Sequence, residues 1–126
     1  EERLSDSVSL LSGGQRQCLT LLMATLSLPH LLLLDEHTAS LDPKTAEKVI
    51  DLTDRIVREN ELTTIMITHN MNQAINFGDR MIMLHEGKIQ FDIKGEEKRH
   101  LTVEEVVKRF GEKLEDETLL CKPVGG

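Results

Sequence analysis

The sequence predicts an α/β domain in which buried parallel strands alternate with helices and an antiparallel hairpin forms one edge. Short apolar runs at residues 31–34 and 63–68 alternate with helical patterns, which is typical of parallel strands covered by helices. Two more strand patterns, at residues 80–85 and 88–93, meet at Glu86-Gly87, which favours a hairpin turn. These strands are too few to complete a sheet unaided, so we expect part of the domain to lie outside this sequence.

The composition indicates a folded chain whose main partner is not nucleic acid. The chain has 126 residues, of which 39% are hydrophobic and 29% charged, as in one globular domain with one core. A formal net charge of -7 argues against binding to a phosphate backbone or to anionic lipid. Because no apolar run approaches the roughly 20 residues of a membrane-spanning helix, we expect any link with a membrane to pass through a partner protein.

The first predicted elements are a helix and a strand. Residues 14–27 carry a helical pattern whose apolar positions are Leu19, Leu22, Met23 and Leu26. Pro29 ends this helix, because proline removes a backbone donor and restricts the residue before it. The uninterrupted run at residues 31–34 predicts a strand that is buried on both faces.

A second helix and strand follow a short loop. Asp42 is a good N-cap and Pro43 a good first residue for a helix. One face of this helix is apolar, with Ala46, Val49, Ile50, Thr53, Ile56 and Val57. The β-branched run at residues 63–68 predicts the next buried strand, and a short helix from Asn70 to Phe77 is expected to end at Gly78.

The last part of the chain is predicted to hold a charged connector and one more helix. The connector is residues 94–100, and the helix begins with a capping box of Thr102 and Glu105. The buried face of this helix is predicted to carry Val103, Val106, Val107 and Phe110, and Gly111 is expected to end it. We therefore divide the chain into an α/β domain over residues 1–110 and an acidic, flexible tail over residues 111–126.

The segment Leu11-Ser12-Gly13-Gly14-Gln15 combines a small-residue turn with a helix start. Ser12 can donate its hydroxyl, and the two glycines allow backbone N–H groups to come close to a ligand. The partial positive charge of the helix N-terminus would add to this site, which therefore suits a phosphate. Alternatively, the segment is only an N-cap with a flexible turn, and the segment alone favours that interpretation.

Acidic residues and a histidine follow the two predicted parallel strands. Asp35 and Glu36 come directly after the first strand, and His69 follows the second. Because parallel strands end at the same edge of a sheet, we expect the three side chains to lie together. One carboxylate could hold Mg²⁺, the other could polarise an attacking water, and the histidine could contact a phosphate. Each of these features, taken singly, could instead be an ordinary polar strand end.

Together these motifs resemble those of the ABC ATPases, the ATP-binding subunits of ABC transporters. The resemblance runs from about residue 7 to residue 93 and keeps the order of the family's motifs. It covers the signature motif at residues 11–15, the Walker B strand with its glutamate at residues 31–36, the D-loop at Ser40-Leu41-Asp42, and the switch histidine His69. The resemblance implies part of a P-loop NTPase fold.

The resemblance also implies roles for these residues. Two ATPase subunits would face each other head to tail with ATP between them. The signature residues Ser12, Gly13, Gly14 and Gln15 would contact ATP bound mainly to the other subunit, and Asp42 would couple the two sites. Asp35 would support Mg²⁺, Glu36 would act on the attacking water, and His69 would sense the γ-phosphate.

The partners and location implied by the resemblance are those of a transport ATPase. The subunit would work in the cytoplasm, on the inner face of the membrane, against membrane permease subunits and with a possible substrate-binding protein. His37 stands where the family usually has proline. A subset of bacterial transport ATPases shares this histidine and a connector like Gly95-Glu96-Glu97-Lys98, which favours uptake of a small organic solute in a bacterium.

A phosphate-binding loop of the form G-x-x-x-x-G-K-[ST] does not occur in these 126 residues. Gly87-Lys88 is followed by Ile89, and residue 82 is Ile82 rather than glycine. We therefore expect the sequence to be a C-terminal piece of the subunit that begins just before the signature motif and is inactive alone. Two alternatives stay open, a soluble ABC ATPase without a transport role and a truncated, non-catalytic subunit that occupies a dimer interface.

Overall fold

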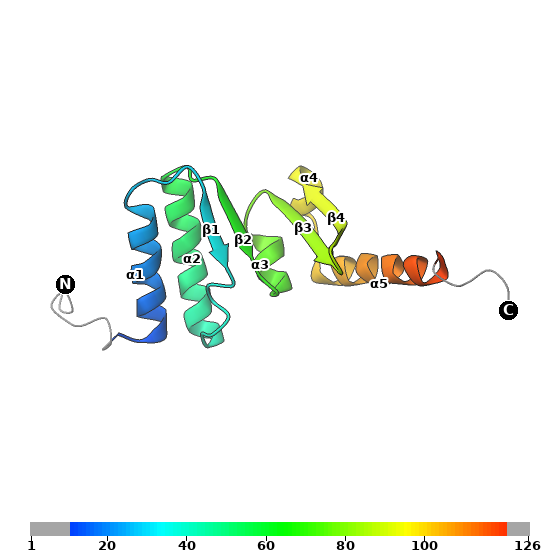
Figure 1. Cartoon of the computed structure of the whole chain (residues 1–126), viewed down its shortest axis with the longest axis horizontal. Helices are drawn as coiled ribbons and strands as arrows, with labels where there is room; N and C mark the ends of the chain where they lie inside the picture. The colour runs from blue at the N-terminus through cyan, green and yellow to red at the C-terminus, as the bar shows by residue number, and fades with distance from the viewer. Residues whose placement is uncertain (1–10, 121–126) are drawn as a thin grey trace. The chain divides into compact units, whose positions relative to one another are not determined.

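The computed structural model of the protein describes residues 11–120, with side chains through residue 115. The chain divides between His69 and Asn70 into two compact units. Each unit has a two-stranded sheet of its own, parallel in the first unit and antiparallel in the second (Figure 1). The predicted mixture of helices, parallel strands and a hairpin is confirmed, but in the described residues the hairpin forms a separate sheet and is not an edge of the parallel one.

The first unit has the order helix, strand, helix, strand, with elements α1 (Gly13–Thr25), β1 (Leu32–Asp35), α2 (Pro43–Glu59) and β2 (Thr64–Ile67). The two strands pair in parallel, with Leu32 opposite Thr64 and Asp35 opposite Ile67. α1 and α2 run side by side, and both begin at the end of the unit where β1 finishes (Figure 1). The helix starts and the strand ends are therefore at the same end of this unit.

One face of the parallel sheet is packed and the other is exposed. The core joins both helices to the sheet through Leu21, Leu32, Leu34, Ile56 and Leu62. On the other face, Leu33 is 66% exposed and Ile65 is 54% exposed. The prediction that the first strand is buried on both faces is therefore wrong for this chain, because both helices pack on the same face of the sheet.

The predicted helix at residues 14–27 is confirmed with slightly shorter bounds, but its apolar stripe is not its buried one. Leu22, Met23 and Leu26 are exposed. The buried positions of α1 are instead Gly14, Leu21 and Thr25. α1 has apolar residues on two sides, so its periodicity identifies a helix without identifying the side that faces α2.

The second unit contains α3 (Met71–Asn76), β3 (Arg80–His85), β4 (Lys88–Lys94), α4 (Gly95–Arg99) and α5 (Val103–Leu120). The hairpin is confirmed, and at its turn both Glu86 and Gly87 have positive φ, 48° and 74°. That combination fits a turn whose twist matches the right-handed twist of the strands. The core of this unit is formed by Met81, Ile93, Leu101 and Val106.

The connector at residues 94–100, predicted without regular structure, contains the short helix α4. Lys98 of this helix is only 4% exposed. Its Nζ donates to the backbone oxygen of Ile75 at 2.6 Å and to that of Phe77 at 3.0 Å. These carbonyls lie at the C-terminal end of α3, where backbone acceptors lack helical partners, so Lys98 caps α3 from another element.

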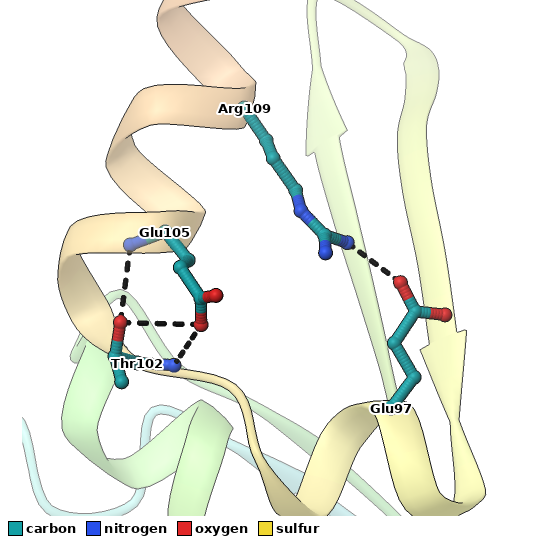
Figure 2. A network of polar contacts seen from close by, with 4 residues as sticks. All are labelled: Glu97, Thr102, Glu105 and Arg109. Carbon is teal, nitrogen blue, oxygen red and sulfur yellow. Dashed lines mark hydrogen bonds and ion pairs between the residues drawn. The ribbon is translucent and has the colours of Figure 1, made fainter.

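The predicted capping box at the start of α5 is confirmed (Figure 2). The backbone N–H of Thr102 donates to Glu105 Oε2 at 3.0 Å, and the N–H of Glu105 donates to Thr102 Oγ1 at 3.3 Å. Figure 2 also shows Arg109 reaching from α5 to Glu97 of α4, with 2.7 Å between Nη1 and Oε1. The cap and this ion pair together fix the first turns of α5 on the short helix.

The last helix does not end at Gly111 as predicted but continues to Leu120. A glycine inside an exposed helix costs only about 1 kcal/mol relative to alanine, and the residues that follow it are good helix formers. The predicted buried face is confirmed for Val106, whereas Val107 is 54% exposed. The tail proposed for residues 111–126 is thus helical as far as residue 120, and residues 121–126 lie outside the described part of the chain.

Candidate functional site

The C-terminal ends of the two parallel strands bring Asp35, Glu36 and His69 to one edge of the sheet. Asp35 is the last residue of β1 and pairs with Ile67 of β2. The backbone N–H of Glu36 then donates to the carbonyl of Ile67 at 2.8 Å, which extends the strand pairing by one residue. Glu36 itself has a φ of 47°, a left-handed conformation that turns the chain sharply away from the sheet.

Glu36 and His69 face each other directly. His69 Nδ1 lies 3.3 Å from Glu36 Oε1, and the two side chains are 73% and 46% exposed. An exposed ion pair of this length contributes little to stability. The arrangement therefore leaves the Glu36 carboxylate open to solvent, where it could act on a water molecule, with an imidazole beside it.

The loop from Glu36 to Asp42 is held by hydrogen bonds at both ends. Its first turn is closed by the Ala39 N–H, which donates to the carbonyl of Glu36 at 3.0 Å. At its far end Asp42 caps α2 by accepting from the N–H of Thr45 at 3.0 Å. The hydrogen bonds of Thr45, first of its side chain and then of its backbone, hold the pKa of Asp42 below its ordinary value.

His37 connects the same loop to α2. Its Nε2 lies 3.0 Å from the hydroxyl oxygen of Thr53, which is buried in the middle of that helix. The Thr53 hydroxyl donates its own hydrogen to the carbonyl of Val49 at 2.7 Å, so its oxygen is left to accept from His37. Partial burial lowers the pKa of His37, which favours a neutral ring that carries its hydrogen on Nε2.

The glycine-containing turn at the start of α1 forms a capping box. Ser12 Oγ accepts from the N–H of Gln15 at 3.2 Å, and Gln15 Oε1 accepts from the N–H of Ser12 at 3.0 Å. The N-cap interpretation is therefore confirmed at the level of local structure. The Ser12 hydroxyl is exposed and still has a hydrogen to donate, so capping leaves it able to contact an anion.

The two glycines of this turn allow α1 to approach α2. A Cβ on Gly14 would lie 2.3 Å from Thr45 Cγ2, a separation that real atoms do not tolerate, and one on Gly13 would lie 3.3 Å from Leu41. Gly14 is accordingly buried. From the sequence, the glycines were expected to let backbone N–H groups come close to a ligand, and at Gly14 the missing side chain also makes room for Thr45 of α2.

The carboxylate at the strand edge is compatible with a metal that takes its remaining ligands from other molecules. Among residues 11–115, no three His, Cys, Asp or Glu side chains converge as a complete metal site. Asp35 is exposed and offers one carboxylate beside Glu36. Mg²⁺ is commonly held by one or two carboxylates and by the phosphates of its substrate. A single carboxylate at this edge is therefore compatible with Mg²⁺, which would neutralise phosphate charge when bound.

Solved structures with similar folds are ATP-binding cassettes. The bacterial ABC transporter cassette MJ0796 aligns with a TM-score of 0.60 and 36% identity over 75% of this chain and 40% of its own length. It has been solved as a dimer, and also in a post-hydrolysis state bound to ADP and Pi. The parallel strand pair, its helices and the hairpin therefore represent part of the P-loop NTPase fold of such cassettes.

Proteins with similar sequences are likewise described as ATP-binding proteins of transport or import systems. A tyrosine transport ATP-binding protein of Clostridioides difficile is 57% identical over 107 residues, which is 85% of this chain and 43% of the relative. An aliphatic sulfonates import ATP-binding protein of Paraburkholderia xenovorans is 41% identical over 91 residues, 72% of this chain and 27% of the relative. No protein-family model matches the chain. Over the matched residues, the chain belongs to the family of ABC transporter ATP-binding proteins.

These matches cover only part of each relative. The chain spans less than half the length of the curated relatives it matches. Within residues 11–120, no helix is both long enough and apolar enough to cross a membrane. The matches therefore establish the family for this stretch of sequence.

Two contacts of this region were not predicted from the sequence. In the sequence His37 stood out only as a replacement for the proline usual in the family, but in the structure it bonds to Thr53 sixteen residues later. Thr45 was not singled out, although it packs on Gly14. Neither contact follows a local spacing rule, because each joins residues of different elements and depends on how the loop folds onto α2.

Proposed function

We propose that this chain forms the C-terminal part of the ATP-hydrolysing subunit of an ABC transporter. The observation that carries the proposal is the joint position of Asp35, Glu36 and His69 at the end of the parallel strands, in a stretch homologous to transport ATP-binding proteins. A carboxylate beside an imidazole at this edge is suited to the positioning of a water molecule for attack on a phosphoryl group.

In this proposal each side chain of the strand edge has one task. Glu36 accepts a proton from the attacking water, for which its exposed carboxylate is available. His69 contacts the γ-phosphate and stays next to Glu36. Asp35 holds Mg²⁺, which supplies positive charge to the phosphates when it is bound. The fixed backbone of Glu36, bonded to Ile67, keeps the carboxylate in one place.

The turn at the start of α1 serves a second subunit. Ser12, Gly13, Gly14 and Gln15 contact ATP bound mainly to the partner, using the Ser12 hydroxyl and the helix N-terminus. Asp42, which begins α2 beside this turn, couples the two sites. The dimeric form of the similar cassette MJ0796 supports this arrangement.

The transport role follows from the relatives. Both relatives described above are named for transport or import of small organic solutes. We infer that the complete subunit lies in the cytoplasm on the inner face of the membrane, bound to permease subunits and supplied by a substrate-binding protein. These names favour transport over a soluble ABC ATPase or a non-catalytic subunit.

The experiment uses the complete subunit that contains this chain. Glu36→Gln keeps the size of the side chain but removes its charge, so ATP should bind normally while turnover stops and an ATP-dependent dimer accumulates. Ser12→Arg should bind ATP and fail to dimerise, because the larger side chain fills the turn. Size-exclusion chromatography with ATP and Mg²⁺ compares the two variants. Turnover of Glu36→Gln at the parent rate would contradict the proposal for Glu36.

The 126-residue chain itself should not hydrolyse ATP. It contains no G-x-x-x-x-G-K-[ST] loop, the segment whose backbone N–H groups and lysine hold the β- and γ-phosphates. Phosphate release by this chain should equal that of its Glu36→Gln variant. Release above that control would show that another segment takes over the task of the loop.

A further inference from the structure

A side-chain contact between the two ends of the loop that carries Glu36 attaches this loop to α2. His37 is the contact residue, and its partner Thr53 is 4% exposed. Thr53 is in turn bonded to the carbonyl of Val49 in the same helix. The chain of hydrogen bonds runs from the loop to the hydroxyl and on to the helix backbone, and it ends in the core of the first unit.

The contact acts on a residue whose conformation needs support. Glu36 precedes His37 and has a φ of 47°, a region that residues other than glycine occupy at a cost. Such a conformation persists where the surrounding structure fixes it. On one side Glu36 is fixed by its N–H bond to Ile67. On the other side the Glu36 carbonyl accepts from the Ala39 N–H within the loop, and the ring of His37 bonds to α2.

We propose that His37 is a positioning residue for the attack on ATP, acting through Glu36, and that its hydrogen bond to Thr53 holds the Glu36 turn in the conformation that hydrolysis requires. The inference rests on the proposed function of Glu36. In this role His37 acts without contacting the nucleotide or the attacking water, and its contribution is to restrict the direction in which the neighbouring carboxylate points. A small misplacement of a catalytic group lowers the rate without weakening substrate binding.

The variants separate the hydrogen bond from the bulk of the ring. His37→Leu keeps an apolar side chain of similar size and removes the donor, whereas His37→Gln keeps a donor at a similar reach. Thr53→Val removes the acceptor from the other side with little change in shape. Thr25→Val is the matched control, because Thr25 is equally buried and its hydroxyl also bonds to the carbonyl four residues earlier in its helix.

The first measurement is steady-state ATP turnover by the complete subunit. His37→Leu and Thr53→Val should each lower kcat by between about 10- and 100-fold with KM for ATP unchanged. The double variant should be no slower than either single one, because both remove the same bond. His37→Gln should recover most of the rate, and Thr25→Val should match the parent. Multiplicative losses in the double variant, or a KM effect instead of a kcat effect, would overturn the inference.

The second measurement does not depend on hydrolysis. Hydrogen exchange of the nucleotide-free subunit reports on the Glu36 N–H, which is protected by its bond to Ile67. His37→Leu and Thr53→Val should speed exchange in the segment of residues 35–41, and His37→Gln and Thr25→Val should not. A parent subunit without ATPase activity would refute the proposed function. An active parent whose His37→Leu variant keeps both its exchange and its turnover would refute the role of His37 alone.

Discussion

Gly14 shows how a single missing side chain sets the distance between two helices. The residue is buried where α1 meets the first turn of α2, and a Cβ there would lie 2.3 Å from Thr45 Cγ2. The next nearest atom, Thr45 Cβ, would be 3.8 Å away, which is an ordinary contact. One methyl group of Thr45 therefore decides whether alanine can replace this glycine.

Gly14→Ala should destabilise the protein by about 1–2 kcal/mol, since the strain of overpacking exceeds the gain in helix propensity. Thr45→Ser removes the obstructing methyl group and keeps the hydroxyl. In that background the same change at residue 14 should become neutral or stabilising. Chemical denaturation of the four proteins gives the two differences in the free energy of unfolding.

Gly111 provides the control for this pair. It also lies in a helix, α5, but a Cβ there would meet nothing within 4 Å. Gly111→Ala should therefore stabilise the protein by up to about 1 kcal/mol. If Gly14→Ala were equally stabilising in the presence of Thr45, the packing explanation for this glycine would be wrong.

Asp42 adds a pH dependence to the start of α2. Its pKa in the folded state lies below its ordinary value of 3.8 because Thr45 donates to the ionised carboxylate. The unfolded chain therefore takes up the proton first as the pH falls. The contribution of Asp42 to stability is complete above pH 3.8 and is lost as the pH falls through the folded pKa.

Asp42→Asn should flatten this part of the acid-stability curve. Asparagine caps helices about as well as aspartate but does not titrate. Unfolding by denaturant, measured between pH 6 and pH 2, should show a smaller loss of stability for the variant than for the parent. Parallel curves for the two proteins would mean that the carboxylate gains nothing from its bonds to Thr45.

Among the elements, α3 depends on a residue outside itself. This helix has no buried residue, and the last carbonyls of its C-terminal end are bonded by the Lys98 ammonium of α4. Burial lowers the pKa of Lys98, and Asp79 opposes that shift in part. The Lys98 ammonium stays buried at this position because it donates to two backbone oxygens that need a donor.

Lys98→Met should destabilise the protein by about 1–3 kcal/mol, because methionine fills the space of the stem but leaves both carbonyls without this donor. Lys108 is the matched control, since its side chain is 76% exposed. Lys108→Met should change stability by less than about 0.5 kcal/mol. Thermal unfolding that fails to separate the two variants would argue against a capping role for Lys98.

The parts of the structure that follow from local spacing were predicted from the sequence. The cap at Asp42 and the Thr102–Glu105 box each join residues three apart, so a short window of sequence contains the whole interaction. The position of Asp35 and His69 at the same edge of the sheet was also predicted, because the chain order of strand, helix, strand indicates parallel strands.

The parts that depend on a distant neighbour were not predicted. The buried side of α1 could not be predicted, because the stripe through Leu22 and the stripe through Leu21 are both apolar, and only contact with α2 distinguishes them. The burial of Lys98 depends on α3, more than twenty residues earlier in the chain. Helix α5 continues through Gly111 because a glycine inside an exposed helix costs only about 1 kcal/mol relative to alanine.

At the scale of the whole chain, the parallel sheet presents an uncovered apolar face. Leu33 and Ile65 are partners in the strand register and are both more than half exposed, and Ile67 beside them is 55% exposed. Contiguous apolar side chains on a sheet surface favour association with another surface. Within residues 11–120 this sheet has two strands, so each of them has an unpaired edge there.

The 126-residue chain should therefore associate with itself as its concentration rises. Leu33→Thr combined with Ile65→Thr should reduce this association, since threonine keeps the strand propensity and removes apolar area. Val107→Thr in the other unit, where the original side chain is 54% exposed, serves as the control. Analytical ultracentrifugation distinguishes the outcomes, and a parent chain that stays monomeric at every concentration would contradict the prediction.

The enclosure of Lys98 also has a consequence for chemical labelling. Lys98 is 4% exposed and its amine is bonded to two carbonyls, so it should resist acylation by amine-reactive reagents, while the exposed Lys108 reacts quickly. The ratio of the two labelling rates, read by mass spectrometry, then reports whether the second unit is folded in any preparation of the protein. It needs no activity, no nucleotide and no mutation, so it can accompany each of the comparisons above as a check on that unit.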